Sequence, residues 1–392
     1  MINQERQGHM DRDVYEQLAK FLDDLPAGFP RSESGVELRI LRHLFTPEEA
    51  NLARHLALIT EEARVIAVRA GLPLAETERI LAEMERKRIV YAFHEDKKPT
   101  RYMAEQFVIG FWEGQVNRLD RELVEMFEEY LPTYARSGIW EKAPQLRTIP
   151  VRESLAVNEA VPVKDLILPY EQIDAIVAAH QTFAVANCVC RQEMRLVGHD
   201  CGKPLETCLA FDSGADYFVR EGRGRFITRA ETLAIIRKAE ETGLVLQTGN
   251  DRTPGSLCMC CGCCCGVLRS LKMNPFPARL ASSPFVAVLD RNACAGCGTC
   301  LDRCQMEALS LPDGAAVLDL ERCIGCGLCV TTCPSNALTL ARKPEAEQRP
   351  VPKDVVQMTI RLAQSRGRLG LLQMVGMATR SAVDRFRAAL QH

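Results

Sequence analysis

Apolar side chains recur at helical spacing through the first 148 residues of the chain, and turn signals separate the segments. Thr46-Pro47-Glu48-Glu49 places a capping Thr before Pro at the first helical position and Glu at the third, which predicts a helix start. Helical patterns follow at 61–70 and 74–87, with a Gly between them, and strand-like residues with a turn follow at 89–98. The pattern predicts a mostly helical N-terminal domain that contains a short hairpin.

The order helix, Gly turn, helix and hairpin is that of a winged helix-turn-helix, a module that often reads DNA. Nine basic and eight acidic residues lie between positions 61 and 101, and four of the acidic residues are Glu side chains of the second helix. Such a helix would repel phosphates and would gain little from counterion release. We therefore expect a protein-docking or structural role, and DNA binding is the less favoured alternative.

The pattern changes after residue 142. A stretch rich in Pro and charge, from Ala143 to Pro169, is typical of a linker. Beyond it, helix-like and strand-like segments alternate, and one helix is expected to begin after Thr228 with Glu231 as its capping partner. The chain ends in a basic helical tail from about Pro352, which we expect to fold back as helices or to dock on an acidic partner; a self-packing helical hairpin is an equal alternative.

Composition and charge exclude several classes of protein. The chain has 392 residues with 49 basic and 51 acidic side chains, so a dominantly nucleic-acid-binding protein is excluded. We expect no membrane span, because no run approaches the roughly 18 apolar residues that a span needs. The N-terminus lacks the profile of a secretory signal, and we expect a cytoplasmic protein. The unusual feature is the presence of 18 Cys, all after residue 187, which in a reducing compartment indicates metal binding or redox chemistry.

Eight of these cysteines form a repeated motif. Cys294-x-x-Cys297-x-x-Cys300-x-x-x-Cys304 recurs 29 residues later as Cys323-x-x-Cys326-x-x-Cys329-x-x-x-Cys333, followed by Pro334. With its Gly flanks, the region 284–342 resembles the two-cluster [4Fe-4S] ferredoxins of bacterial type. A pair of zinc knuckles is the weaker alternative, because the spacing is three plus one rather than two plus two.

The resemblance implies two [4Fe-4S] clusters with crossed ligation. The first cluster would take Cys294, Cys297, Cys300 and Cys333, and the second would take Cys323, Cys326, Cys329 and Cys304. One position departs from the family, because Gln305 follows Cys304 where a Pro is usual. The extra N–H of Gln305 could alter hydrogen bonding near Cys304 and tune the nearby cluster.

The other ten cysteines are the candidate ligands of further metal centres: Cys188, Cys190, Cys201, Cys208, Cys258, Cys260, Cys261, Cys263, Cys264 and Cys265. Concentrated soft thiolates favour iron-sulfur clusters or zinc, and we expect the two groups to share at least one site. Ten ligands suffice for two more four-Cys clusters, or for one cluster and a zinc ion, and the spacing does not decide between them. His180 and His199 lie nearby as minor candidates, and the Arg side chains of this region could offset thiolate charge or dock an acidic partner.

A second resemblance spans nearly the whole chain. Cys188-Val189-Cys190-Arg191 and Cys260-Cys261-Gly262-Cys263-Cys264-Cys265, ahead of two ferredoxin motifs, resemble a group of long ferredoxin-like proteins with a winged-helix start. The Cys-Cys-Gly element is also similar to that of heterodisulfide-reductase subunits, but the further cysteines that this family needs are not at the required distances.

These observations predict a multidomain α+β fold. The expected domains are a winged-helix-like helical domain at 1–148, a Cys-rich α/β metal-binding domain at 149–280, a 2[4Fe-4S] ferredoxin domain at 281–345 and a helical tail at 346–392. As cofactors we expect two [4Fe-4S] clusters, and one or two additional iron-sulfur clusters or zinc in the Cys-rich domain.

The favoured function is electron transfer, in which single electrons pass between partner oxidoreductases in anaerobic redox metabolism. The expected partners are redox proteins, in an oxidoreductase complex, and a homo-oligomer is left open. The motifs favour an electron carrier or oxidoreductase subunit over an independent enzyme, and no catalytic residue is assigned. The alternatives are a redox-sensing winged-helix transcriptional regulator and an oxidoreductase subunit with a catalytic cluster in the Cys-rich domain.

Overall fold

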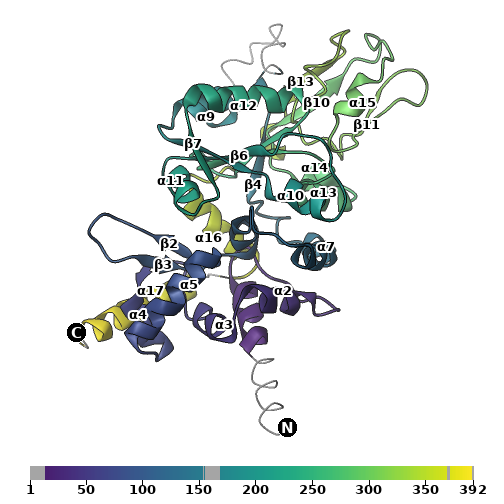
Figure 1. Cartoon of the computed structure of the whole chain (residues 1–392). Coiled ribbons are helices and arrows are strands. Elements are labelled where there is room, and N and C mark those ends of the chain that lie inside the picture. Colours follow the sequence, from purple (N-terminus) through teal and green to yellow (C-terminus); the bar gives the residue numbers. More distant parts are fainter. Residues whose placement is uncertain (1–13, 153, 155–167, 369–370, 391–392) are drawn as a thin grey trace. The chain divides into compact units, whose positions relative to one another are not determined.

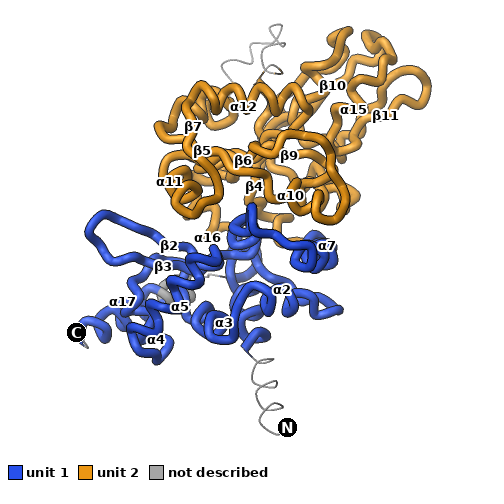
Figure 2. The backbone as a smooth tube through the Cα atoms, in the orientation of Figure 1, with its two compact units in different colours: residues 1–137, 362–392 blue, residues 138–361 orange. Residues whose placement is uncertain are grey.

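The computed structural model describes residues 14–152, 154, 168–368 and 371–390. The chain divides into two compact units (Figure 2). Unit 1 combines Met1–Ser137 with Leu362–His392, and unit 2 is Gly138–Arg361. Within the described residues, no helix combines the length and the apolar character that crossing a membrane requires.

Unit 1 is mainly helical (Figure 1). A helix through residues 14–24 comes first. The elements that follow are α2 (Val36–Leu44), α3 (Pro47–Ala53), β1 (Glu61–Glu62), α4 (Ala63–Ala70), α5 (Leu74–Lys87), β2 (Tyr91–Phe93), β3 (Arg101–Met103), the irregular turn η1 (Phe107–Phe111), α6 (Trp112–Gly114), α7 (Arg121–Arg136) and α17 (Leu371–Leu390). The three strands form an antiparallel sheet in the order β1-β3-β2.

Local sequence signals explain where these helices begin and end. Thr46 caps α3 in a complete capping box with Glu49, as the sequence predicts. Gly71 ends α4 with a left-handed φ of 68°, a conformation that Gly adopts without steric cost. Aromatic rings fill the core, where Trp112 stacks on Phe127 with centroids 3.9 Å apart.

A buried ion-pair network holds the C-terminal helix α17 in unit 1. The guanidinium of Arg69 donates to both carboxylate oxygens of Glu61 at 2.6 and 2.7 Å and to Asp384 of α17 at 2.8 Å. Ser381 of α17 also donates to Glu61, at 2.6 Å. The three charged side chains are at most 7% exposed. The tail therefore folds back and packs on α4, which was one of the sequence expectations.

The neighbouring His55 is expected to make unit 1 less stable in acid. Burial, followed by the positive charges of Arg54, Arg380 and Arg69, lowers the pKa of His55 to about 4. Between pH 6.5 and 4, His55 is protonated in the unfolded chain but stays neutral in the folded chain. The free energy of unfolding therefore falls as the pH falls through this window. We expect the midpoint of thermal unfolding to be lower at pH 4.5 than at pH 7. The difference between the two midpoints should be smaller in His55→Gln. An unchanged difference in that variant would contradict the assignment.

Unit 2 is built on a six-stranded antiparallel sheet with the order β4-β8-β9-β6-β5-β7. Its strands are β4 (Leu146–Ile149), β5 (Phe183–Asn187), β6 (Glu206–Phe211), β7 (Gly224–Ile227), β8 (Val245–Gly249) and β9 (Ser256–Cys260). Its helices are η3 (Pro169–Glu171), α9 (Ile173–Ala178), α10 (Val189–Leu196), α11 (Ser213–Arg220), α12 (Arg229–Glu241), α13 (Gly266–Met273) and α14 (Pro277–Leu280).

The ferredoxin-like segment of unit 2 follows this sheet (Figure 1). It pairs β10 (Phe285–Leu289) with β13 (Leu338–Arg342) and β11 (Leu309–Ser310) with β12 (Val317–Leu318), all antiparallel. Helix α15 (Thr299–Arg303) lies between β10 and β11 in the sequence, and η4 (Glu345–Glu347) and α16 (Val355–Ser365) follow β13. Helix α16 crosses the division between the units at residue 361.

Two sequence expectations for unit 2 have different outcomes. Helix α12 begins after Thr228 with Glu231 as its capping partner, as predicted. The linker expected at 143–169 is wrong in part, because β4 lies within it and pairs with β8 at the edge of the sheet. Residues 153 and 155–167 of that stretch lie outside the described residues.

The Cys-rich and ferredoxin-like segments share one hydrophobic core. Leu246 and Leu257 of the sheet are buried in the same cluster as Met306, Ile324 and Leu328 of the ferredoxin-like segment. Arg303 of α15 donates to the carbonyl oxygens of Glu240 and Glu241 at the end of α12, where the negative end of the helix dipole favours a cation. The two segments are thus built as one body.

Candidate iron-sulfur and metal centres

The cysteines that the sequence assigns to the second ferredoxin cluster line a common hollow. Cys304, Cys323, Cys326 and Cys329, here called the second ferredoxin set, surround it together with apolar side chains such as Leu328. Burial raises the pKa of Cys326 to about 12, and the charges of Cys304 and Cys323 contribute. Four convergent thiols in an apolar hollow are the donor set that a [4Fe-4S] cluster uses, so the residues present fit this group.

Glycine allows the loop of this set to wrap closely. A Cβ on Gly325 would lie 2.1 Å from the carbonyl oxygen of Phe285, and one on Gly327 would lie 2.3 Å from Ser154 Oγ. Both glycines have left-handed φ values, 66° and 77°. A larger residue at either position would push the thiols out of place.

The first ferredoxin set is Cys294, Cys297, Cys300 and Cys333. Burial raises the pKa of Cys300, and the charges of Cys297, Cys294 and Cys333 add to this effect. Cys297 is exposed, whereas Cys300 is buried. Four thiols are also the donors that a [4Fe-4S] cluster uses, and in this set the thiol of Cys297 lies at the protein surface.

Hydrogen bonds to sulfur surround both ferredoxin sets. Backbone N–H groups donate to the sulfur atoms of Cys304, Cys323 and Cys294 at 3.2 to 3.5 Å. The hydroxyl of Thr299 donates to Cys297 at 3.5 Å. Such donors stabilise thiolates and are one means by which a protein adjusts cluster potential.

The other ten cysteines, which all lie in unit 2, divide into a group of six and a group of four. The six lie next to one another in a closed ring, here called the six-thiol ring, in the order Cys188, Cys190, Cys265, Cys260, Cys258, Cys208 and back to Cys188. Both sequence groups contribute thiols to it, and the shared metal site that the sequence predicts stays a prediction.

Strand geometry explains the membership of the ring. Cys258 and Cys260 are two residues apart in β9 and so lie on the same face of the sheet. Cys208 of β6 is the direct register partner of Cys258. Cys188 and Cys190 lie at the start of α10, directly after β5, and Cys265 caps α13.

The ring separates the acidities of its members. Hydrogen bonds from neighbouring thiols lower the pKa of Cys188, Cys258 and Cys265, the last to about 5. Donating those bonds, together with burial, raises the pKa of the other three well above the ordinary value. More acidic and less acidic thiols therefore alternate around the ring, and the more acidic ones are the readiest to bind a metal as thiolates.

Arg191 is the buried cation beside these thiols. Its guanidinium donates to the carbonyl oxygens of Met259 and Pro204 at 2.8 Å each, and it is 2% exposed. Burial opposes its charge, but Cys188 of the ring and the thiolate of Cys261 raise its pKa. Arg191 therefore offsets thiolate charge, one of the roles considered for the Arg side chains of this region.

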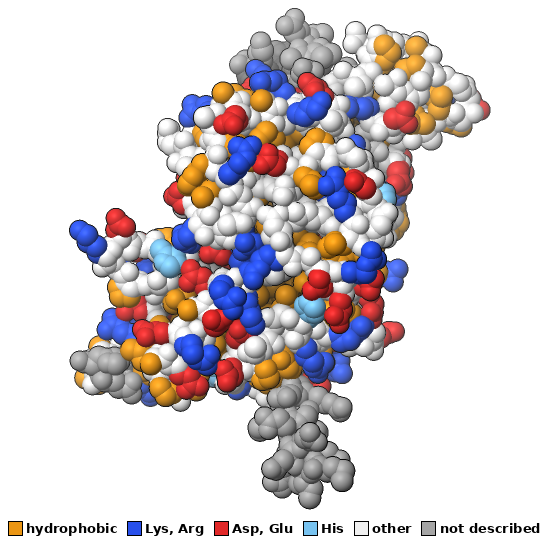
Figure 3. Space-filling view, viewed as in Figure 1, with side chains coloured by type: hydrophobic (Ala, Val, Ile, Leu, Met, Phe, Trp, Pro, Cys, Tyr) orange, Lys and Arg blue, Asp and Glu red, His pale blue; other side chains and the backbone are white. Residues whose placement is uncertain are grey.

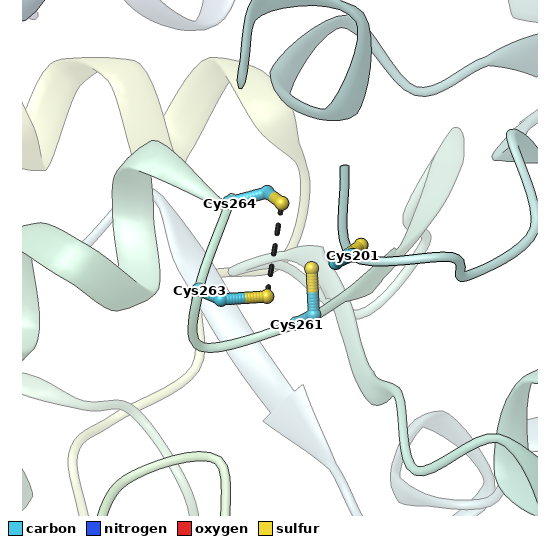
Figure 4. A group of neighbouring side chains, drawn as sticks. All are labelled: Cys201, Cys261, Cys263 and Cys264. Atoms are coloured by element: carbon cyan, nitrogen blue, oxygen red, sulfur yellow. Dashed lines mark hydrogen bonds between the residues drawn. The ribbon is translucent and has the colours of Figure 1, made fainter. Parts of the chain in front are cut away.

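The remaining four cysteines form a compact group, here called the four-thiol group: Cys201, Cys261, Cys263 and Cys264. Their Sγ atoms all lie within 4.8 Å of one another. The Sγ atoms of Cys263 and Cys264 are 3.7 Å apart, and those of Cys201 and Cys261 face the same space (Figure 4). Three members come from the turn between β9 and α13, and Cys201 comes from the loop between α10 and β6.

Gln305 connects the four-thiol group to the second ferredoxin set. Its side-chain oxygen accepts the N–H of Gly262 at 2.8 Å, and a Cβ on Gly262 would lie 2.2 Å from the Gln305 carbonyl oxygen. The sequence showed that Gln305 is unusual beside Cys304. Its partner could not be predicted, because the two residues lie 43 positions apart.

His180 does not contact the thiols through its ring. Its Nδ1 lies 2.7 Å from a carboxylate oxygen of Asp212, and the ring stacks on Phe211 with centroids 4.7 Å apart. His199 is exposed. Arg225 pairs with Glu206 through two bonds of 3.0 Å, so this side chain already has an acidic partner within the chain.

Comparison with known proteins identifies part of the ferredoxin-like segment. Residues 316–339, which include Cys323, Cys326, Cys329 and Cys333, match the 4Fe-4S binding domain family. Comparisons with curated proteins and with solved structures found no match. The chain therefore contains a 4Fe-4S binding domain, which indicates at least one [4Fe-4S] cluster.

Proposed function

We propose that this protein transfers single electrons between partner oxidoreductases through a series of iron-sulfur centres. The observation that carries the proposal is the shared core of unit 2, where the second ferredoxin set packs beside the Cys-rich segment. Cys304 and Cys326 of that set pack against the cluster of buried side chains that contains Cys260 and Cys265 of the six-thiol ring.

The two ferredoxin sets would each hold a [4Fe-4S] cluster, and the six-thiol ring would hold a further iron-sulfur cluster through four of its thiols, with Cys208, the register partner of Cys258, among them. Such clusters, when bound, accept and release one electron at a time. The chain contributes N–H donors to sulfur, partly or fully buried thiols in the second set and the ring, and an exposed thiol, that of Cys297, at which a redox partner could approach.

Metal analysis tests the number of centres. For full-length protein purified without oxygen we expect about twelve iron and twelve acid-labile sulfide atoms per chain, four for each of three clusters. Cys208→Ser should lower both values by about four, because it opens the six-thiol ring. About eight of each in the unsubstituted protein would limit iron to the ferredoxin sets and remove the third centre from the proposal.

We further propose that the winged-helix-like part of unit 1, which consists of α4, α5, β2 and β3, binds partner proteins rather than DNA. The cationic side chains of α5 already have acidic partners: Arg79 lies 3.0 Å from Glu48, and Lys87 lies 2.6 Å from Glu49. Acidic and basic side chains are interspersed on the face shown in Figure 3. Neutralised cations contribute little to phosphate binding.

A salt titration separates docking from DNA recognition. We expect a 30-base-pair random duplex to bind weakly at about 50 mM salt and not measurably at 150 mM, because few phosphates would be neutralised. Fluorescence anisotropy with the full-length, cluster-loaded protein measures this. Selection of one tight-binding sequence from a random pool at 150 mM salt would instead support the redox-sensing transcriptional regulator.

A further inference from the structure

We propose that the four-thiol group binds a single Zn²⁺ ion in a closed tetrahedral site. The ion would join the loop that carries Cys201 to the turn that carries Cys261, Cys263 and Cys264. The site would be structural, and it would stand outside the series of redox centres.

The sulfur spacing favours one ion over a cluster. Zinc binds thiolates at about 2.3 Å, so the sulfurs of a tetrahedral site lie about 3.8 Å apart. The distance of 3.7 Å between the sulfurs of Cys263 and Cys264, and the limit of 4.8 Å for the whole group, are close to this value. In a [4Fe-4S] cluster each thiolate extends outward from a different iron, so the sulfurs must stand farther apart.

The loop around the site is held in shape from outside. Gly262 allows the turn to approach Gln305, whose side chain accepts its N–H at 2.8 Å. Cys261 and Cys264 are buried, and Cys201 closes the group from a separate loop (Figure 4). Four thiol ligands leave no open position, which is the arrangement of structural rather than catalytic zinc.

The donor chemistry favours zinc over a single iron. Four thiolates and one Zn²⁺ leave two negative charges, and the buried guanidinium of Arg191, which bonds the carbonyl oxygen of Met259 two residues before Cys261, offsets part of that charge. Divalent zinc also binds a given thiolate site more tightly than ferrous iron does.

Zinc analysis and X-ray absorption of the full-length protein test the site. We expect about one zinc per chain, with an absorption edge fitted by four sulfurs at about 2.3 Å. Cys201→Ser should lower the zinc content at least fivefold and leave iron and sulfide unchanged. Cys208→Ser, the matched control in the six-thiol ring, should lower iron and sulfide and keep the zinc.

Three outcomes would overturn the proposal. The protein could contain no zinc and lose equal amounts of iron and sulfide in Cys201→Ser. The site could instead hold a single iron without sulfide, or the zinc could be bound through nitrogen or oxygen atoms. If Cys201→Ser does not fold, the absorption spectrum of the unsubstituted protein decides between four sulfurs and other ligands. None of these readouts depends on electron transfer, so the zinc site and the proposed function can fail separately.

Discussion

Replacing Cys323 by Ala is expected to remove one [4Fe-4S] cluster and to unfold much of the ferredoxin-like segment. The thiol is buried, accepts an N–H from Ala287 and lines the hollow of the second ferredoxin set. Cluster binding supplies much of the folding energy of so small a segment. Loss of the cluster should therefore destabilise the segment beyond the four thiols themselves. Iron content should fall by at least about four atoms per chain, and one low-potential signal should disappear from the electron paramagnetic resonance spectrum.

The control for this variant is Gln305→Pro, beside Cys304, the proposed fourth ligand. It gives up the hydrogen bond from Gly262 but removes no thiol, so the cluster count should not change. If Cys323→Ala keeps both ferredoxin clusters with unchanged reduction spectra, Cys323 is not a ligand.

Replacing Arg191 by Ala is expected to empty the six-thiol ring. The substitution leaves the carbonyl oxygens of Met259 and Pro204 without their donor and the buried thiolates without their cation. Removing one partner of a buried charge pair costs about 3–5 kcal/mol. We expect iron and sulfide to fall by about four atoms each, with a lower temperature of unfolding, measured by metal analysis and circular dichroism.

Arg195→Ala is the matched control on the same helix, because Arg195 is exposed and pairs with Asp200 at 3.1 Å. Exposed ion pairs contribute little, so this variant should retain its metal and its stability. Equal loss in both variants would mean that α10 tolerates no substitution and that the buried charge of Arg191 is not the cause.

Local signals in the sequence predicted the helix starts and the ferredoxin sets. Each capping box joins a Thr to a Glu three positions later, as in Thr46 with Glu49 and Thr228 with Glu231. Both partners of the interaction are therefore visible in a short stretch of sequence. The cysteine spacing likewise predicted the second ferredoxin set, whose members the fold gathers around one hollow.

The division of the ten other cysteines could not be predicted from spacing. Cys260 and Cys261 are adjacent in the sequence, yet Cys260 belongs to the six-thiol ring and Cys261 to the four-thiol group. They separate because β9 ends between them and the chain turns. Likewise, Arg69 and Asp384 are 315 positions apart, so no local pattern indicates that the tail packs on α4. The short edge strand β4 is hidden in the sequence because the residues around it are rich in Pro and charge, and its pairing with β8, about 100 positions away, is not a local signal.

A reductive titration under anaerobic conditions, followed by electron paramagnetic resonance on the full-length protein, tests electron transfer most directly. We expect at least three one-electron centres that reduce and reoxidise reversibly, with signals broadened by magnetic interaction because the centres share one compact unit. Cys208→Ser should remove one of them and leave the ferredoxin pair. Clusters that are destroyed by reduction, or that cannot be reoxidised, would contradict the proposal that this protein transfers electrons.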